Sequence, residues 1–172
     1  ANANIIVGSQ GADTINGGGG NDTMWGDCRT SSCKTLISQN FSSYSISSGG
    51  NDILNGGAGD DTLYGEDGED TLNGGAGNDT IISGSGSDVI IITSSSDSDT
   101  LSDFTDGTDS IGFDSSITSS NLVISASGSD TVIRNGSDIL LTLTGISSAN
   151  VTPADLQSTS TDAETINGTS GN

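Results

Sequence analysis

The chain has 172 residues, a formal net charge of −20, only three basic residues and 3% aromatic residues. This composition is typical of disorder unless something offsets the charge, because little apolar material is left for a conventional core. The negative charge repels phosphate backbones and anionic membranes, so no nucleic acid partner is expected. No apolar run approaches the ~20 residues of a membrane-spanning helix and no signal segment opens the chain, so no membrane insertion is expected.

A nine-residue repeat dominates the N-terminal half. Seven aspartates share one frame, with a glycine two residues before and an apolar residue two residues after: Asp13, Asp22, Asp52, Asp61, Asp70, Asp79 and Asp88. In each repeat a polar, glycine-rich turn precedes a three-residue strand whose middle side chain points inward. Nine residues therefore form half a coil. Aspartates eighteen residues apart stack at the strand spacing of ~4.8 Å.

Stacked carboxylates at this spacing require a cation between them. At an effective dielectric constant of ~20, two neighbours repel by about 3 kcal/mol. The turns offer carboxylate and carbonyl oxygens, which are the ligands of calcium, whereas zinc is disfavoured because the chain has no histidine and its two cysteines lie outside the repeats. We predict about five or more Ca²⁺ ions, five of them at the stacked pairs Asp13/Asp52, Asp22/Asp61, Asp52/Asp70, Asp61/Asp79 and Asp70/Asp88. Folding should then depend on calcium, and replacing Asp61 should cost more than replacing Glu66.

The repeat units resemble those of a known family. Gly56-Gly-Ala-Gly-Asp-Asp-Thr-Leu-Tyr64 and Gly74-Gly-Ala-Gly-Asn-Asp-Thr-Ile-Ile82 are similar to the G-G-x-G-x-D-x-U-x nonapeptide of repeats-in-toxin (RTX) modules. The resemblance implies an all-β fold, a right-handed parallel β-roll with Ca²⁺ in the turns that is closed by a C-terminal β cap. It also implies a secreted, extracellular or cell-surface bacterial protein exported by type I secretion. Residues 1–27 should form the first part of the roll and residues 49–93 the main roll.

An insertion interrupts the roll. Asp22 and Asp52 are 30 residues apart instead of nine, so 21 extra residues are present, which we place at residues 28–48. The insertion begins with Cys28 and Cys33, for which we predict a disulfide; two unpaired thiols are the alternative. Closing so short a loop would stabilise the fold by roughly 2 kcal/mol.

Residues at the ninth position of each repeat point outward and form rows. One face should carry Trp25, Tyr64 and Ile82, and the opposite face Asn16, Asn55, Asn73 and Ile91. An exposed aromatic row is normally covered by another segment or bound by a partner. We expect the insertion to fold back over this contact face, and a carbohydrate or protein contact is the alternative.

Residues 94–157 are predicted to form the cap. Their sequence resembles the segment that closes RTX modules, including the C-terminal domains of serralysin-type proteases and the R modules of alginate epimerases. Asp97, Asp99 and Asp103 are candidates for one further calcium site, and a solvated acidic turn is the alternative. Stretches of alternating residues at 121–126, 130–134 and 138–144 predict three strands, and Asn135-Gly136 predicts a hairpin between the last two.

The tail, residues 158–172, resembles the start of another repeat. Ala163–Asn172 matches Ala12–Asn21 at seven of ten positions. Two explanations remain open. Either copies self-associate, with Glu164–Asn167 of one copy pairing with the strand edge at Asn4–Val7 of the next, or tandem copies follow one another in a longer polypeptide.

No enzyme is expected, because the chain has no histidine and one lysine and its carboxylate pairs all lie in the calcium frame. The sequence predicts instead a calcium-binding structural module of a secreted or cell-surface protein, in one version assembled head-to-tail into an extracellular array or filament. The alternative is a glycan-binding module attached to a secreted enzyme or adhesin. A neutral glycan on Trp25 and Tyr64 is then favoured, because a charge of −20 repels uronates.

Overall fold

The computed structural model describes residues 3–8, 11–26, 49–93, 97–114, 117, 121–152 and 154–158. The insertion at 28–48, with Cys28 and Cys33, and residues 159–172 of the tail lie outside the described residues. The disulfide, the domain boundaries and the pairing of the tail therefore stay predictions. In the part of the chain that the structure describes, no helix is long and apolar enough to cross a membrane.

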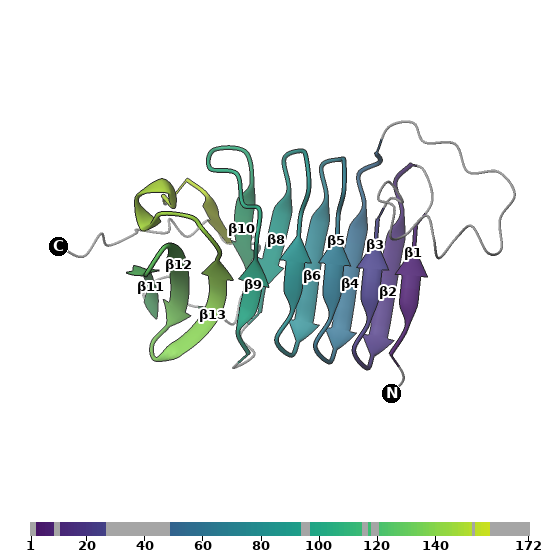
Figure 1. Ribbon diagram of the computed structural model, residues 1–172, viewed down its shortest axis with the longest axis horizontal. Helices are drawn as coiled ribbons and strands as arrows, with labels where there is room; N and C mark the ends of the chain where they lie inside the picture. Colours follow the sequence, from purple (N-terminus) through teal and green to yellow (C-terminus); the bar gives the residue numbers. More distant parts are fainter. Residues whose placement is uncertain are drawn as a thin grey trace, which may run out of the picture.

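Two sheets face each other and form a roll (Figure 1). Sheet A has the strand order β1-β3-β5-β7-β9-β13-β12-β11, and sheet B has the order β14-β10-β8-β6-β4-β2. From β1 to β10, consecutive strands lie in alternate sheets and each pairs in parallel with the strand one coil away. The predicted all-β fold and parallel β-roll are confirmed.

The strands of the roll are short, as the nine-residue repeat predicts. Sheet A takes β1 (Ile5–Val7), β3 (Thr23–Trp25), β5 (Thr62–Tyr64), β7 (Thr80–Ile82) and β9 (Asp99–Leu101). Sheet B takes β2 (Thr14–Gly19), β4 (Ile53–Ala58), β6 (Thr71–Ala76), β8 (Val89–Ile92) and β10 (Ser110–Phe113).

The pairing register continues across the insertion. Asn16 on β2 lies opposite Asn55 on β4, and Asn55 lies opposite Asn73 on β6. Paired residues are 39 positions apart between β2 and β4, across the insertion, and 18 positions apart between β4 and β6. One coil thus contains 21 additional residues, the number that the spacing of the aspartates gave.

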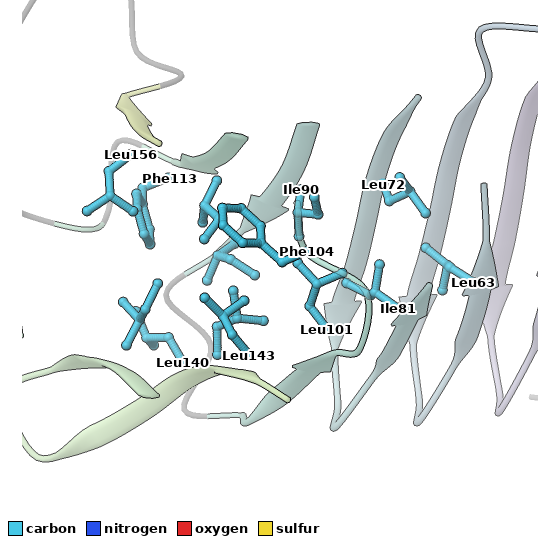
Figure 2. Packing of buried hydrophobic residues seen from close by; sticks show 14 of the residues in the cluster. Leu63, Leu72, Ile81, Ile90, Leu101, Phe104, Phe113, Leu140, Leu143 and Leu156 are labelled. Atoms are coloured by element: carbon cyan, nitrogen blue, oxygen red, sulfur yellow. The ribbon is translucent and has the colours of Figure 1, made fainter. Parts of the chain in front are cut away.

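The middle residue of each strand triad fills the space between the sheets, as Figure 2 shows for Leu63, Ile81, Leu72 and Ile90. Each of these side chains is 0% exposed and sits in register with its equivalent one coil away. The core is therefore a narrow stack of single aliphatic side chains from each half-coil. The small apolar content of the chain is sufficient for such a core because the repeats put it where both sheets meet.

The C-terminal strands extend both sheets at the end opposite β1 and β2 (Figure 1). β11 (Leu122–Ser127), β12 (Asp130–Asn135) and β13 (Asp138–Leu143) are antiparallel to one another, and β13 pairs in parallel with β9. A 3₁₀ turn, η2 (Ser148–Asn150), precedes β14 (Leu156–Ser158), which pairs with β10. The predicted hairpin at Asn135-Gly136 is present. Leu140, Leu143 and Leu156 join the core of the roll (Figure 2), and the closing role of this region stays a prediction.

Candidate metal-binding edges of the roll

The turns place the aspartates in two columns, one on each edge of the roll. Turns that lead from sheet B to sheet A form the first edge, which carries Asp22, Asp61, Asp79 and Asp99. Turns that lead from sheet A to sheet B form the second edge, which carries Asp13, Asp52, Asp70, Asp88 and Asp109. Six of the seven repeat aspartates are no more than 2% exposed, and Asp13, in the terminal coil, is half-buried.

A ladder of hydrogen bonds joins successive aspartates along each edge. The backbone N–H of one aspartate donates to Oδ1 of the aspartate in the next coil, as Asp61 does to Asp79 at 2.8 Å and Asp70 does to Asp88 at 2.9 Å. All five stacked pairs predicted from the sequence are joined in this way. Asn4 begins the first-edge ladder by donating its N–H to Asp22 at 2.7 Å.

The second carboxylate oxygen has a different environment. Oδ2 is buried and accepts no hydrogen bond in Asp22, Asp61, Asp79 and Asp88. A buried carboxylate oxygen without a hydrogen-bond donor is costly, and buried charges are usually paired or bound to a metal. The arrangement repeats on both edges, so it belongs to the repeat and not to one irregular turn.

Glycine carbonyls surround these oxygens. At Gly56, an added Cβ would lie 2.4 Å from both Asp61 Oδ2 and the Gly74 carbonyl oxygen. At Gly17, the corresponding Cβ would lie 2.6 Å from Asp22 Oδ2 and 2.5 Å from the Gly56 carbonyl oxygen. The first glycine of the repeat is thus required because the backbone passes close to the carboxylate. Without a side chain there, carbonyl and carboxylate oxygens of neighbouring coils come together.

Burial raises the pKa of several aspartates on both edges. It raises the pKa of Asp79 and of Asp88 to about 6 and that of Asp99 to about 7. Desolvation is the largest cause, a backbone N–H donor opposes it, and neighbouring carboxylates such as Asp61 beside Asp79 raise the pKa further. The same desolvation raises the pKa of Asp61 and Asp109. Asp79, Asp88 and Asp99 therefore hold a proton to a higher pH than an ordinary carboxyl group.

The donor set fits calcium better than a transition metal. No three Asp, Glu, His or Cys side chains converge as a metal site in the described ranges, so an ion held there must take most of its ligands from the backbone. Calcium accepts that mixture, because it binds six to eight oxygens that include backbone carbonyls. The buried Oδ2 atoms and the adjacent glycine carbonyls supply oxygens of this kind.

The further site predicted from Asp97, Asp99 and Asp103 does not form as one cluster. Asp99 continues the first edge by accepting the N–H of Asp79 at 3.0 Å, and Asp97 accepts the N–H of Gly77 on the same edge. Asp103 lies on the second edge, where it accepts the N–H groups of Ser83 and Gly84. The three residues are close in sequence, but β9 runs across the roll between Asp97 and Asp103 and separates them.

Two further aspartates occupy the second edge and were not among the predicted site residues. Asp109 accepts the N–H of Asp88 at 3.2 Å and the N–H of Thr105 at 2.7 Å. Asp155, just before β14, accepts the N–H of Thr152 at 2.7 Å and is 4% exposed. Asp109 could have been found, because Gly107 and Ile111 flank it in the repeat frame. Its 21-residue distance from Asp88 hid the match.

The predicted contact face forms in register but is not an open aromatic surface. Trp25, Tyr64 and Ile82 are neighbours on β3, β5 and β7, as predicted. However, Trp25 is only 7% exposed, and its ring stacks on that of Tyr64 with 5.2 Å between centroids and 7° between planes. The two rings therefore present a face to each other. A sugar stacks on an open ring face, so this geometry does not favour a glycan on these two residues.

The comparisons with known proteins agree with the repeat. The family model for the RTX calcium-binding nonapeptide repeat (four copies) matches residues 1–27, 46–81 and 60–90. A comparison with curated proteins found no matching sequence.

Among solved structures, the chain is similar to AlgE6R2, a subunit of the Azotobacter vinelandii mannuronan C5-epimerase. The identity is 21%, the match covers 83% of this chain and 89% of that chain, and the TM-score is 0.51. The AlgE6R3 subunit of the same epimerase is 23% identical, with coverage of 96% and 91% and a TM-score of 0.41. The extracellular lipase LipA of Serratia marcescens is 16% identical, with coverage of 91% and 40% and a TM-score of 0.43. The first of these likenesses supports the fold.

Proposed function

We propose that the chain, of which residues 1–27, 46–81 and 60–90 match the RTX calcium-binding nonapeptide repeat, is a structural module of a secreted or cell-surface protein that folds when calcium binds along both edges of its roll. The observation that carries the proposal is the series of buried Oδ2 atoms without hydrogen-bond donors at Asp22, Asp61, Asp79 and Asp88. A buried carboxylate oxygen without a hydrogen-bond donor requires a positive charge beside it. The chain has only three basic residues, so a bound cation is the better candidate.

The proposed ligands come from both kinds of oxygen in the turns. On the first edge Asp22, Asp61 and Asp79 would hold ions together with carbonyls such as those of Gly56 and Gly74, and on the second edge Asp13, Asp52, Asp70 and Asp88 would do the same. Bound calcium supplies the positive charge that the stacked carboxylates require. The chain orients the ligand atoms: Oδ1 of Asp79 and of Asp88 accepts an N–H of the preceding coil, which leaves Oδ2 of these residues for the ion.

The proposed stoichiometry is about five or more ions, one for each stacked pair. Five divalent ions would change the formal charge from −20 to −10. We propose that Asp99 adds to the first edge, whereas Asp97 and Asp103 are engaged by backbone N–H groups. No catalytic role is proposed, because the buried aspartates of the described residues lie along the two edges of the roll, where the repeat accounts for them.

The calcium concentration outside cells is consistent with the proposed extracellular location. Sites that bind in the range of 10⁻⁴–10⁻³ M are filled outside cells and empty in the cytosol, so a roll of this kind folds only after export. Assembly of copies into an array, and export by type I secretion, are the finer parts of the proposal. Cys28 and Cys33 would form a disulfide in the same oxidising surroundings.

Far-ultraviolet circular dichroism during a calcium titration tests the proposal. The chain in chelator is expected to give the spectrum of a coil and to gain β-structure near ~1 mM calcium. Magnesium at the same concentration is the control, since it demands six ligands in a small octahedron and loses water reluctantly. A spectrum that is the same in chelator and in calcium would refute calcium-dependent folding.

A further inference from the structure

We propose that the free edge of β2 is a docking site for residues 164–168 of a second copy of this chain, which add to sheet B as a parallel strand. The proposal rests on the calcium-folded roll proposed above. It specifies where a head-to-tail contact would form and which residues would make it.

Among the described residues, no strand lies beside β2 at the N-terminal end of sheet B. β1 is a strand of sheet A, and consecutive half-coils alternate between the sheets. The half-coil before β1 would therefore stack on β2, which is the last strand of sheet B among the described residues. The structure thus moves the expected contact from the edge at Asn4–Val7 to the edge of β2.

The backbone of β2 can pair with a further parallel strand on its outer side. In sheet B the first N–H of each strand donates to the coil before it: Ile53 to the carbonyl of Asp13, Thr71 to that of Asp52 and Val89 to that of Asp70. Thr14 is the equivalent residue of β2, and no described strand precedes it. Lysine, proline and bulges, which commonly protect strand edges, do not occur in Thr14–Gly19.

The occupant is identified by a signature that only sheet B carries. The strands β2, β4 and β6 begin Thr-Ile-Asn-Gly, Ile-Leu-Asn-Gly and Thr-Leu-Asn-Gly, whereas β3, β5 and β7 have tryptophan, tyrosine or isoleucine in place of the asparagine. Residues 165–168 read Thr-Ile-Asn-Gly. The tail is therefore a sheet B strand by sequence, and its register against β2 follows: Thr165 with Thr14, Ile166 with Ile15 and Asn167 with Asn16.

Residues 166–168 of the docked segment are of the same type as the residues at the equivalent positions of β2 and β4. Ile166 would continue the stack of Ile15, Leu54 and Leu72 between the sheets, and Asn167 would extend the outer row of asparagines. Gly168 takes the place of Gly17 and Gly56, where a Cβ would lie within 2.5 Å of the carbonyl of the next coil. Glu164 would come beside Asp13, so the contact requires calcium for the same reason as the stacked pairs within the roll.

The tail of the same copy cannot reach this site. Ser158 pairs with Phe113 at the far end of sheet B, and the docked strand would be six strand spacings away, about 29 Å. The six residues from Ser158 to Glu164 span at most about 21 Å when fully extended. The segment must come from a second molecule. Because the two contacting surfaces differ, the contact repeats without closing and gives linear assemblies.

Sedimentation velocity in millimolar calcium tests the docking in its simplest form. The intact chain is expected to form a concentration-dependent series of oligomers, and a chain ending at Ser158, which keeps β14, is expected to stay monomeric. A labelled synthetic peptide of residues 161–172 should then bind the shortened chain, measured by fluorescence anisotropy, and should lose binding in chelator.

Two pairs of variants locate the contact. Thr14→Pro removes an N–H that faces the free edge and leaves the pairing with β4, so it should abolish peptide binding, whereas Thr14→Ser keeps the N–H and should bind. In the intact chain, Ile166→Asp should abolish oligomers, whereas Thr161→Asp, with the same charge change outside the docked segment, should not.

Circular dichroism of the same samples separates this proposal from the calcium-folding proposal. Chains that fold with calcium, stay monomeric when intact and leave the peptide unbound would overturn the docking site while calcium-dependent folding stands. Equal binding by the Thr14→Pro and Thr14→Ser chains would also overturn it, because the edge of β2 would then not be the contact.

Discussion

Asp61 and Asp79 each use their two carboxylate oxygens differently. Oδ1 of Asp79 accepts the N–H of Asp61, and Oδ1 of Asp61 accepts that of Asp22, so these oxygens hold successive coils in register. Oδ2 of the same residues is buried without a donor and is the oxygen left for an ion. A substitution that keeps the first oxygen and removes the charge from the second therefore isolates the metal role.

Asp61→Asn is such a substitution. Oδ1 can still accept the N–H of Asp22, but the amide that replaces Oδ2 carries no charge. We expect the calcium midpoint of folding to rise about tenfold, since the charge of the ligands sets calcium affinity. Glu66→Gln is the matched control in a neighbouring turn and should shift the midpoint much less. Equal midpoints in the two variants would refute the assignment of Asp61 as a ligand.

Glu66 occupies a backbone position that suits glycine. Its φ is 76°, while Gly57, Gly75 and Gly84 at the equivalent positions of other repeats have φ between 101° and 110°. A side chain in this region costs on the order of 1 kcal/mol. Glu66→Gly should therefore raise the free energy of unfolding in saturating calcium by about that amount, measured by urea denaturation. Glu66→Gln keeps the strain, so an equal gain from Gln would assign the effect to charge.

Within the turns, the hydrogen bonding of the carboxylates changes toward the C-terminal end of the roll. Asp88 has a buried Oδ2 without a donor, whereas the next residue of its column, Asp109, has one oxygen bonded to the N–H of Asp88 and the other to the N–H of Thr105. Asp103 likewise accepts N–H groups with both oxygens. Backbone donors take the place of the ion in these turns because the longer loop folds back on the carboxylate.

This difference predicts opposite behaviour for two neighbouring carboxylates. Asp109→Asn should lower the stability of the calcium-loaded chain by about 1–3 kcal/mol, because one oxygen that accepts a backbone N–H becomes a donor. The number of bound calcium ions should not change. Asp88→Asn should remove at least one ion. Isothermal titration calorimetry with both variants measures the stoichiometry, and loss of an ion in the Asp109 variant would contradict this division.

For the molecule as a whole, the raised pKa values make protons and calcium alternative ways to neutralise the edges. Burial raises the pKa of Asp79 and of Asp88 to about 6 and that of Asp99 to about 7 in the folded chain, above the ordinary 3.8. A raised pKa means that the folded state binds more protons than the unfolded state. Protonation of these carboxyl groups stabilises the folded state fully below the unfolded pKa of 3.8, and this stabilisation is lost as the pH rises through the folded pKa values of about 6 to 7.

Acidification should therefore partly replace calcium. In chelator, the β-structure signal should increase when the pH is lowered from about 7.5 to about 5. In limiting calcium the opposite is expected for ion binding, because protons compete for the same carboxylates and the calcium midpoint rises. A β-structure signal in chelator that falls over this range would contradict the burial of the aspartate columns.

Much of the fold and of the candidate site could be predicted because the repeat is local. A glycine, an aspartate and an apolar residue at fixed spacing specify a turn, a ligand and a core position within nine residues, and repetition fixes which aspartates stack. The five predicted pairs, the outer rows and the 21-residue insertion all follow from this spacing. The sequence analysis missed Asp109, where the spacing changes, and it grouped Asp97 with Asp103, although these sequence neighbours lie on opposite edges.

The sequence by itself thus determined the parallel roll, the oxygen chemistry of its edges and the composition of its core, because each depends on contacts that one repeat makes with an identical neighbour. The tertiary structure decided what depends on how the whole chain is wound. It showed that one oxygen of Asp61 and of Asp79 accepts a backbone N–H, that Trp25 stacks on Tyr64 and is buried, and that no described strand lies beside β2 at the N-terminal end of sheet B. These features arise between coils far apart in the sequence, where hydrogen bonding and burial are set by packing and not by local pattern.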